Sequence, residues 1–182
     1  VLYYDFGRYI TPRGYGWARN KYTDPLLELK TKATFDEHKN LTNVEEIAKE
    51  LDSKSKYTHG VGPLVFSVSK TINFAKAKTY ADEMVKRGYF PYNGLDKSAS
   101  NCARYVTETI KAANEDGTIG TKLKYPLTIR PTPLYNVQST YEGWSSLNCT
   151  CPCPSLSSVC RCAVDIFGGG PATYARSMSA TS

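Results

Sequence analysis

A chain of 182 residues with 41% hydrophobic and 22% charged residues has the size and composition of one folded domain, which excludes a wholly disordered protein. There is no apolar run of roughly 18 residues, so no membrane-spanning segment is predicted. The net charge of +6 comes from basic residues that are interleaved with acidic ones, which argues against a nucleic-acid-binding patch. The chain begins at Val1 and runs directly into an apolar stretch, so we expect a processed product or a fragment that lacks an upstream strand.

Three strands and one short helix are predicted in the first part of the chain. Leu2–Ile10 alternates aromatic and polar residues, and Leu26–Phe35 has the same period of two, so both predict strands. The capping box Thr42-Asn43-Val44-Glu45 predicts a helix that ends near Lys54. Pro63–Ser69 predicts a third strand.

Two longer helices follow. Asn73 is a good N-cap for a helix that ends at Arg87, because Gly88 provides a C-terminal stop. The apolar residues of this helix lie on one stripe: Phe74, Ala77, Ala81, Met84 and Val85. Ser100 or Asn101 caps the next helix, which begins at about Cys102.

The composition changes near the C-terminus. Residues 123–130 are predicted to be extended and end at Pro131-Thr132-Pro133, and from about Glu142 the chain is rich in Ser, Gly, Pro and Cys. We therefore expect an α+β domain over residues 1–141, with a small antiparallel sheet packed against two or three helices. Residues 142–182 are predicted to form an irregular Cys-rich tail.

Cys102 is the candidate nucleophile. A cysteine in the first turn of a helix lies beside unpaired backbone N–H groups and the positive end of the helix dipole, and both favour a thiolate. The same N–H groups can stabilise an oxyanion when the sulfur attacks a carbonyl. Arg104 adds positive charge nearby or points to solvent. The alternative is a structural cysteine, because Cys102 also lies on the apolar stripe of its helix.

Several motifs together resemble a known superfamily. The turn Tyr92-Asn93-Gly94 follows an Ala-rich helix and is followed by Asn101–Val106, which opens the next helix. This order resembles the permuted papain-like superfamily of cysteine hydrolases, which includes relatives of the NlpC-type peptidases and lecithin:retinol acyltransferase-like proteins. More closely, five motifs look like an uncharacterised family of Bacteroidota proteins: Tyr3–Pro12, Thr23-Asp24-Pro25, His59–Gly62, Asn73–Ala77 and Asn101–Val106. The resemblance covers roughly residues 2 to 136.

The resemblance implies a permuted papain-like fold in which a histidine precedes the catalytic cysteine. His59 is therefore the candidate base, and its alternative role is that of a loop residue. His38 lies in a charged stretch and is predicted to be a surface residue. The sequence does not select a third, orienting group from its candidates, Ser67, Ser69 and Asn73. For Asp5 and Asp24 we expect turn or capping roles, and for Asn101 an N-cap.

Five cysteines crowd into the C-terminal segment: Cys149, Cys151, Cys153, Cys160 and Cys162. Their spacing has no Cys-x-x-Cys element, so disulfides between the two runs are expected, with one cysteine left to pair with another chain or with Cys102. The alternative is a metal site like that of a metallothionein.

Two functional classes follow from these observations. The first is a thiol hydrolase or acyltransferase that uses Cys102 and His59, needs no cofactor, and acts on a peptide or a lipid-like acyl substrate. The second is a non-catalytic structural or filament-forming subunit that polymerises through the Cys-rich tail. For both we expect a secreted or extracytoplasmic protein.

Overall fold

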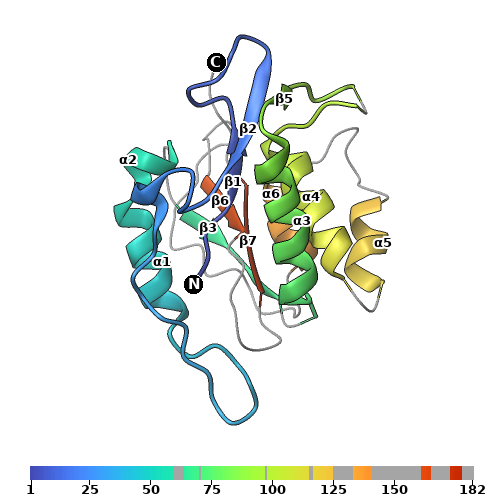
Figure 1. Ribbon diagram of the computed structural model, residues 1–182. Coiled ribbons are helices and arrows are strands. Elements are labelled where there is room, and N and C mark those ends of the chain that lie inside the picture. The colour runs from blue at the N-terminus through green and yellow to red at the C-terminus, as the bar shows by residue number, and fades with distance from the viewer. Residues whose placement is uncertain are drawn as a thin grey trace, which may run out of the picture.

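The computed structural model of the protein describes residues 1–59, 64–69, 71–96, 98–114, 117–124, 133–140, 161–164 and 173–177. In chain order its elements are β1 (Asp5–Gly7), β2 (Tyr15–Arg19), the 3-10 helix η1 (Pro25–Leu27), α1 (Val44–Ser53), α2 (Ser55–Thr58), β3 (Leu64–Phe66), β4 (Val68–Ser69), α3 (Phe74–Arg87), β5 (Phe90–Pro91), α4 (Cys102–Ala113), α5 (Thr118–Lys124), α6 (Pro133–Thr140), β6 (Arg161–Val164) and β7 (Thr173–Ser177). Figure 1 shows the strands lying between α1 and α2 on one side and α3 and α4 on the other.

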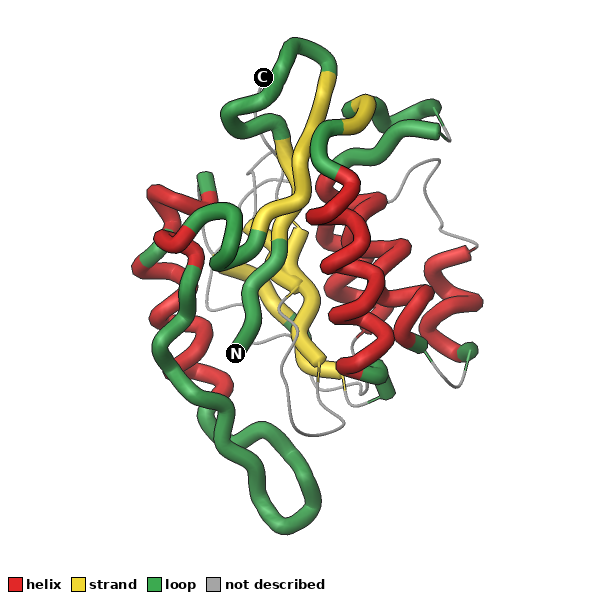
Figure 2. Tube along the Cα trace, in the orientation of Figure 1, coloured by secondary structure: helices red, strands yellow, loops and turns green. Residues whose placement is uncertain are grey.

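A small antiparallel sheet of order β1–β2–β5 carries the N-terminal motif. Phe6 of β1 lies opposite Ala18 of β2, and Gly16 of β2 lies opposite Phe90 of β5. Helix α4 contacts β1, and helix α3 contacts β2. Figure 2 shows this arrangement as strands running beside the long helices. The predicted fold class, an α+β domain with a small antiparallel sheet packed against helices, is confirmed.

A second sheet has the order β3–β6–β7–β4. Strand β3 pairs in parallel with β6, whereas β4 and β6 each pair antiparallel with β7. Strands β6 and β7 belong to residues 142–182, and the rest of that segment lies outside the described residues. The proposed division into a domain and a tail therefore stays a prediction.

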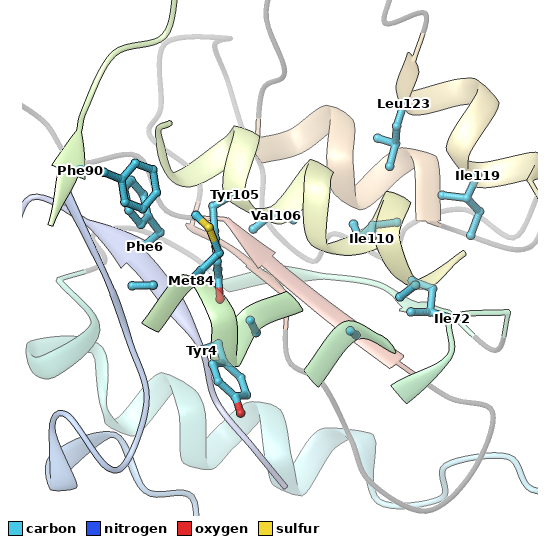
Figure 3. Close-up of a cluster of buried hydrophobic side chains, with 14 residues drawn as sticks. Tyr4, Phe6, Ile72, Met84, Phe90, Tyr105, Val106, Ile110, Ile119 and Leu123 are labelled. Carbon is cyan, nitrogen blue, oxygen red and sulfur yellow. The ribbon is translucent and has the colours of Figure 1, made fainter. Parts of the chain in front are cut away.

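The main hydrophobic core lies between the three-stranded sheet and helices α3, α4 and α5 (Figure 3). Phe6 belongs to this core and is 1% exposed. The Phe6 ring packs against Phe90, Tyr92 and Tyr105, with centroid distances of 4.8, 5.9 and 5.8 Å. Burial of one side chain of this size contributes about 1.5–3 kcal/mol, so the aromatic cluster fixes the position of its members.

The two long helices form as predicted because their signals are local. The Asn73 side chain accepts a hydrogen bond from the Lys76 N–H at 3.0 Å, and Gly88 ends α3 with a φ of 74°. Ala77, Ala81 and Met84 of the predicted stripe are buried. In α4, the Asn101 side chain caps the Arg104 N–H at 2.8 Å.

The strand predictions are less accurate. The strand expected over Leu2–Ile10 is only three residues long, and the one over Pro63–Ser69 divides into β3 and β4. The strand expected over Leu26–Phe35 is wrong. Asp24 caps η1 there, and the N–H groups of Lys30 and Thr31 bond the Glu50 carboxylate at 2.7 and 2.8 Å instead of a neighbouring strand.

The capping box expected at Thr42 is also absent. The N-cap of α1 is Asn43, and its side-chain oxygen accepts from the Thr34 N–H at 3.0 Å rather than from the first turn of the helix. The Thr42 hydroxyl lies 2.6 Å from that of Thr34. Both polar side chains therefore hold the loop before α1, which extends away from the rest of the molecule in Figure 1.

Candidate active site

An open cleft of about 600 Å³ lies where the N-terminal sheet, α2 and α4 meet. Its walls are residues 6–10, Arg19, Asp24, Lys56, Tyr57, His59 and Cys102. The fold thus brings the predicted nucleophile and the predicted base to one cleft from two distant helices.

Cys102 is the first residue of α4 and carries a thiol. Only 8% of the residue is exposed, but it lines the cleft, so burial does not seal it from solvent. Its Sγ atom lies 3.1 Å from the Tyr92 hydroxyl. Burial and the neighbouring Cys102 raise the pKa of Tyr92 well above its ordinary value. The phenol therefore keeps its proton, so it is the donor of this hydrogen bond when Cys102 is a thiolate, and the bond favours that form.

Tyr92 follows β5 and is held from two sides. Its ring stacks on Phe6 with an interplanar angle of 4°, and its N–H donates to the Gly14 carbonyl at 2.9 Å. Sequence reasoning missed this residue, since its contact with Cys102 depends on the turn that joins β5 to α4. The only feature of the sequence that pointed toward Tyr92 was the motif that contains it together with the capping residue Asn101.

Arg104 does not line the cleft. Its guanidinium donates to the carbonyls of Gly94, Asp96 and Ala99, at 2.9 Å for Gly94 and 2.6 Å for Ala99. It therefore stabilises the loop that leads into α4. The alternative that Arg104 simply points to solvent is therefore wrong, whereas the contribution of its charge at Cys102 stays a prediction.

His59 forms the C-cap of α2 in the left-handed region, with a φ of 51° and a ψ of 29°. Few residues other than glycine adopt this conformation, and it is enriched at functional sites. The imidazole packs on the Tyr9 ring at a centroid distance of 5.3 Å. His59 is exposed on the cleft wall, where a bound molecule can reach it.

Arg19 is the central residue of a buried network behind the cleft wall. It is 4% exposed and donates to both Asp5 oxygens, at 3.1 and 2.7 Å, and to Asp24 at 3.1 Å. It also bonds the Tyr57 carbonyl at 3.1 Å, and its guanidinium lies 3.3 Å from the Tyr9 ring centroid. Burial acts to lower the pKa of Arg19, but Asp5 outweighs it, so the guanidinium stays charged. Arg19 thereby ties the sheet to α2 and supports His59 through Tyr9.

The two aspartates of the N-terminal motifs differ from expectation. Asp24 does cap η1, since it accepts from the Leu26 N–H at 3.1 Å, but it also lines the cleft. For Asp5 the expected turn or capping role is wrong, because it lies in β1 and pairs with Arg19. Sequence reasoning did not identify Arg19, because its pairing with Asp5 depends on the antiparallel register of β1 and β2.

The other candidates are engaged outside the cleft. The Ser67 hydroxyl lies 2.6 Å from that of Thr140, the Ser69 hydroxyl lies 3.3 Å from that of Thr71, and Asn73 caps α3. None of the three lines the cleft. His38 lies on the surface beside Glu37, as predicted.

The C-terminal cysteines lie outside the described residues, apart from Cys162, whose backbone belongs to β6. Their disulfides and the alternative metal site stay predictions. In the part of the chain that the structure describes, no three His, Cys, Asp or Glu side chains are grouped around a potential metal position. No helix of that part is long and apolar enough to cross a bilayer.

The helix-terminal thiol, the histidine on the same cleft and the small sheet packed on the helix define a papain-like α+β protein. A family model described as "Type VI secretion system effector TseH-like" matches residues 1–119. The chain belongs to this family, which is of the papain-like cysteine-hydrolase type. No curated protein and no solved structure matches the chain. The likeness to Bacteroidota proteins is not tested by the match and stays a prediction.

Proposed function

We propose that the protein is a thiol hydrolase or acyltransferase that acts on an amide or ester carbonyl through Cys102. The observation that carries the proposal is that Cys102 and His59 line one open cleft. A cleft that reaches the sulfur gives a substrate access to it, which supports catalysis. In the alternative, a structural subunit, the cysteine would need only to be buried in the core.

In the first step the Cys102 thiol gives its proton to the His59 imidazole, and the sulfur attacks the carbonyl carbon. A carbon–sulfur bond forms, and the negative charge that develops on the carbonyl oxygen is stabilised by the positive end of the α4 dipole, because Cys102 is the first residue of this helix. As the oxyanion collapses, the bond to the amine or alcohol breaks, and this leaving group takes a proton from His59. Water or a second nucleophile then gives a proton to His59 and bonds to the acyl carbon. The carbon–sulfur bond breaks, and the proton passes from His59 to the sulfur, which restores the thiol.

Tyr92 assists the reacting sulfur in this scheme. The Tyr92 hydroxyl donates to the sulfur before attack and so stabilises its charge. On the side of the base, the ring of Tyr9 packs on the imidazole of His59. Arg19 lies over the Tyr9 ring and holds it in place.

The family description extends the proposal to the site of action. Effectors of secretion systems are exported, which agrees with the expected extracytoplasmic location. We infer that the chain leaves the producing cell and acts on a peptide or lipid-like acyl substrate of a target cell.

Alkylation of Cys102 by iodoacetamide tests the chemistry without a known substrate. The rate is measured across pH by mass spectrometry of the peptide that contains Cys102, which separates it from the five other cysteines. Folded protein is expected to react at least about tenfold faster than unfolded protein near neutral pH, because the thiolate is stabilised. His59→Gln is expected to slow this reaction and to abolish turnover of acyl substrates.

The matched control is His38→Gln, which removes the exposed histidine outside the cleft. It should leave the alkylation rate unchanged. A folded protein in which Cys102 reacts no faster than an ordinary thiol would remove the basis of the proposal.

A further inference from the structure

The cleft walls carry more positive than negative charge. Arg8, Arg19 and Lys56 line the cleft, and Asp24 is the acidic residue among the described lining residues. Arg19 is engaged by Asp24 and by Asp5 behind the wall. The described residues provide no acidic partner for Arg8 or Lys56. The three cations are Arg8, Arg19 and Lys56, and the two carboxylates are Asp5 and Asp24. The cleft therefore keeps one net positive charge.

Arg8 is the cation that lies near the reacting sulfur. Its guanidinium carbon is 5.6 Å from the centroid of the Tyr92 ring, and the hydroxyl of the same ring contacts Cys102. The guanidinium is thus separated from the sulfur by one aromatic ring and one hydrogen bond. Lys56 reaches the cleft from α2, on the side of His59.

We propose that this cleft binds a carboxylate of the substrate, with Arg8 as the principal contact and Lys56 as the second. A guanidinium offers a planar fork that fits a carboxylate, and its cation–π contact with the Tyr92 ring, at 5.6 Å from the ring centroid, keeps Arg8 on the side of Cys102. A single net positive charge is balanced by a monovalent anion, which favours a carboxylate over a dianionic phosphate. The inference rests on the proposed function and narrows its substrate class to amides or esters with a carboxylate close to the scissile carbonyl.

Competing alkylation by iodoacetate and iodoacetamide measures this preference at Cys102. Both reagents form the same carbon–sulfur bond and release iodide, but only iodoacetate carries a carboxylate. The quantity measured is the rate constant for iodoacetate divided by the rate constant for iodoacetamide. This ratio is expected to fall about three- to tenfold in Arg8→Gln, and less in Lys56→Gln, because each variant removes one nearby positive charge. In the wild type the ratio should also fall as salt is added.

Arg13→Gln and Lys32→Gln are the matched controls. Both residues are exposed and lie outside the cleft, so each variant changes the net charge by the same amount. They should keep the wild-type ratio. A ratio that is equal in the wild type and in Arg8→Gln would overturn the carboxylate site. Fast alkylation of Cys102 without a preference for iodoacetate would contradict the carboxylate site but not the proposed function. Slow alkylation that still favours iodoacetate would contradict the proposed function but not the carboxylate site.

A binding experiment tests the carboxylate site without the need for a reactive thiol. In Cys102→Ser, the resonances of the cleft residues are followed by NMR during titration with N-acetylglycine, its neutral amide and inorganic phosphate. N-acetylglycine is expected to shift the signals of Arg8 and Tyr92, its amide is not, and Arg8→Gln should abolish the effect. Equal response to the amide would overturn the site, and tighter binding of phosphate would overturn the assignment to a carboxylate.

Discussion

The contact between Tyr92 and Cys102 makes a quantitative prediction. Tyr92→Phe keeps the ring that stacks on Phe6 but removes the hydroxyl that lies 3.1 Å from Sγ. A hydrogen bond to a charged group contributes roughly 1.5–3 kcal/mol, and sulfur is a weak acceptor, so we take the lower limit. About 1.5 kcal/mol corresponds to a shift of about one pH unit, upward, in the midpoint of Cys102 alkylation. Below that midpoint the thiolate population falls about tenfold.

The assay is the rate of iodoacetamide alkylation between roughly pH 5 and 10, a range that brackets the pKa of an ordinary thiol. Tyr105→Phe provides a matched control. Tyr105 is also buried and also stacks on Phe6, but its hydroxyl has no hydrogen-bond partner in the described part of the chain. We expect Tyr105→Phe to leave the alkylation midpoint unchanged. It should raise the free energy of unfolding by about 1 kcal/mol, because a buried unsatisfied hydroxyl is removed.

The reasoning would be refuted by an unchanged midpoint in Tyr92→Phe. It would also be refuted if Tyr105→Phe shifted the midpoint as much as Tyr92→Phe, because the effect would then come from the aromatic cluster and not from the hydroxyl. Urea denaturation of both variants checks that the fold is intact.

Three further predictions concern the surroundings of the site. Arg19→Met leaves Asp5 buried without its partner, so urea denaturation should show a loss of about 3–5 kcal/mol, and a loss below about 1 kcal/mol would contradict the role of the pair. Gly16→Ala places a Cβ atom 2.5 Å from Cζ of Phe6 and 2.8 Å from Cδ2 of Tyr92. Cys102 alkylation should slow as the two stacked rings are displaced, and an unchanged rate would contradict the role of the ring stack in placing the Tyr92 hydroxyl. The bonds from the Lys30 and Thr31 N–H groups lower the pKa of Glu50 against the effect of its burial. The stabilisation by Glu50 is therefore present at neutral pH and is lost as the pH falls through its folded-state pKa. Unfolding free energies of the wild type and Glu50→Gln should differ at pH 7 and converge in acid. A difference that persists in acid would contradict the role of the Glu50 carboxylate.

The sequence was sufficient for features that depend on neighbours along the chain. The caps at Asn73 and Asn101 and the stop at Gly88 predicted α3 and α4, and with them the place of Cys102 at a helix N-terminus. Helix signals repeat within three or four residues, so a short window contains them. The prediction failed at residues 26–35, where alternation is present but the N–H groups bond a side chain of α1.

The tertiary structure alone decided what surrounds the thiol. Strand β2 has no local signature of its own, yet its Arg19 binds Asp5, Asp24 and the carbonyl of Tyr57 and so connects three segments behind the cleft. The Tyr92 hydroxyl reaches Cys102 only because Phe6 fixes the ring from another strand. Ion pairs, ring stacking and strand pairing act between residues that the chain brings together only when it folds. Their partners therefore cannot be read from spacing along the sequence, whereas a helix cap can.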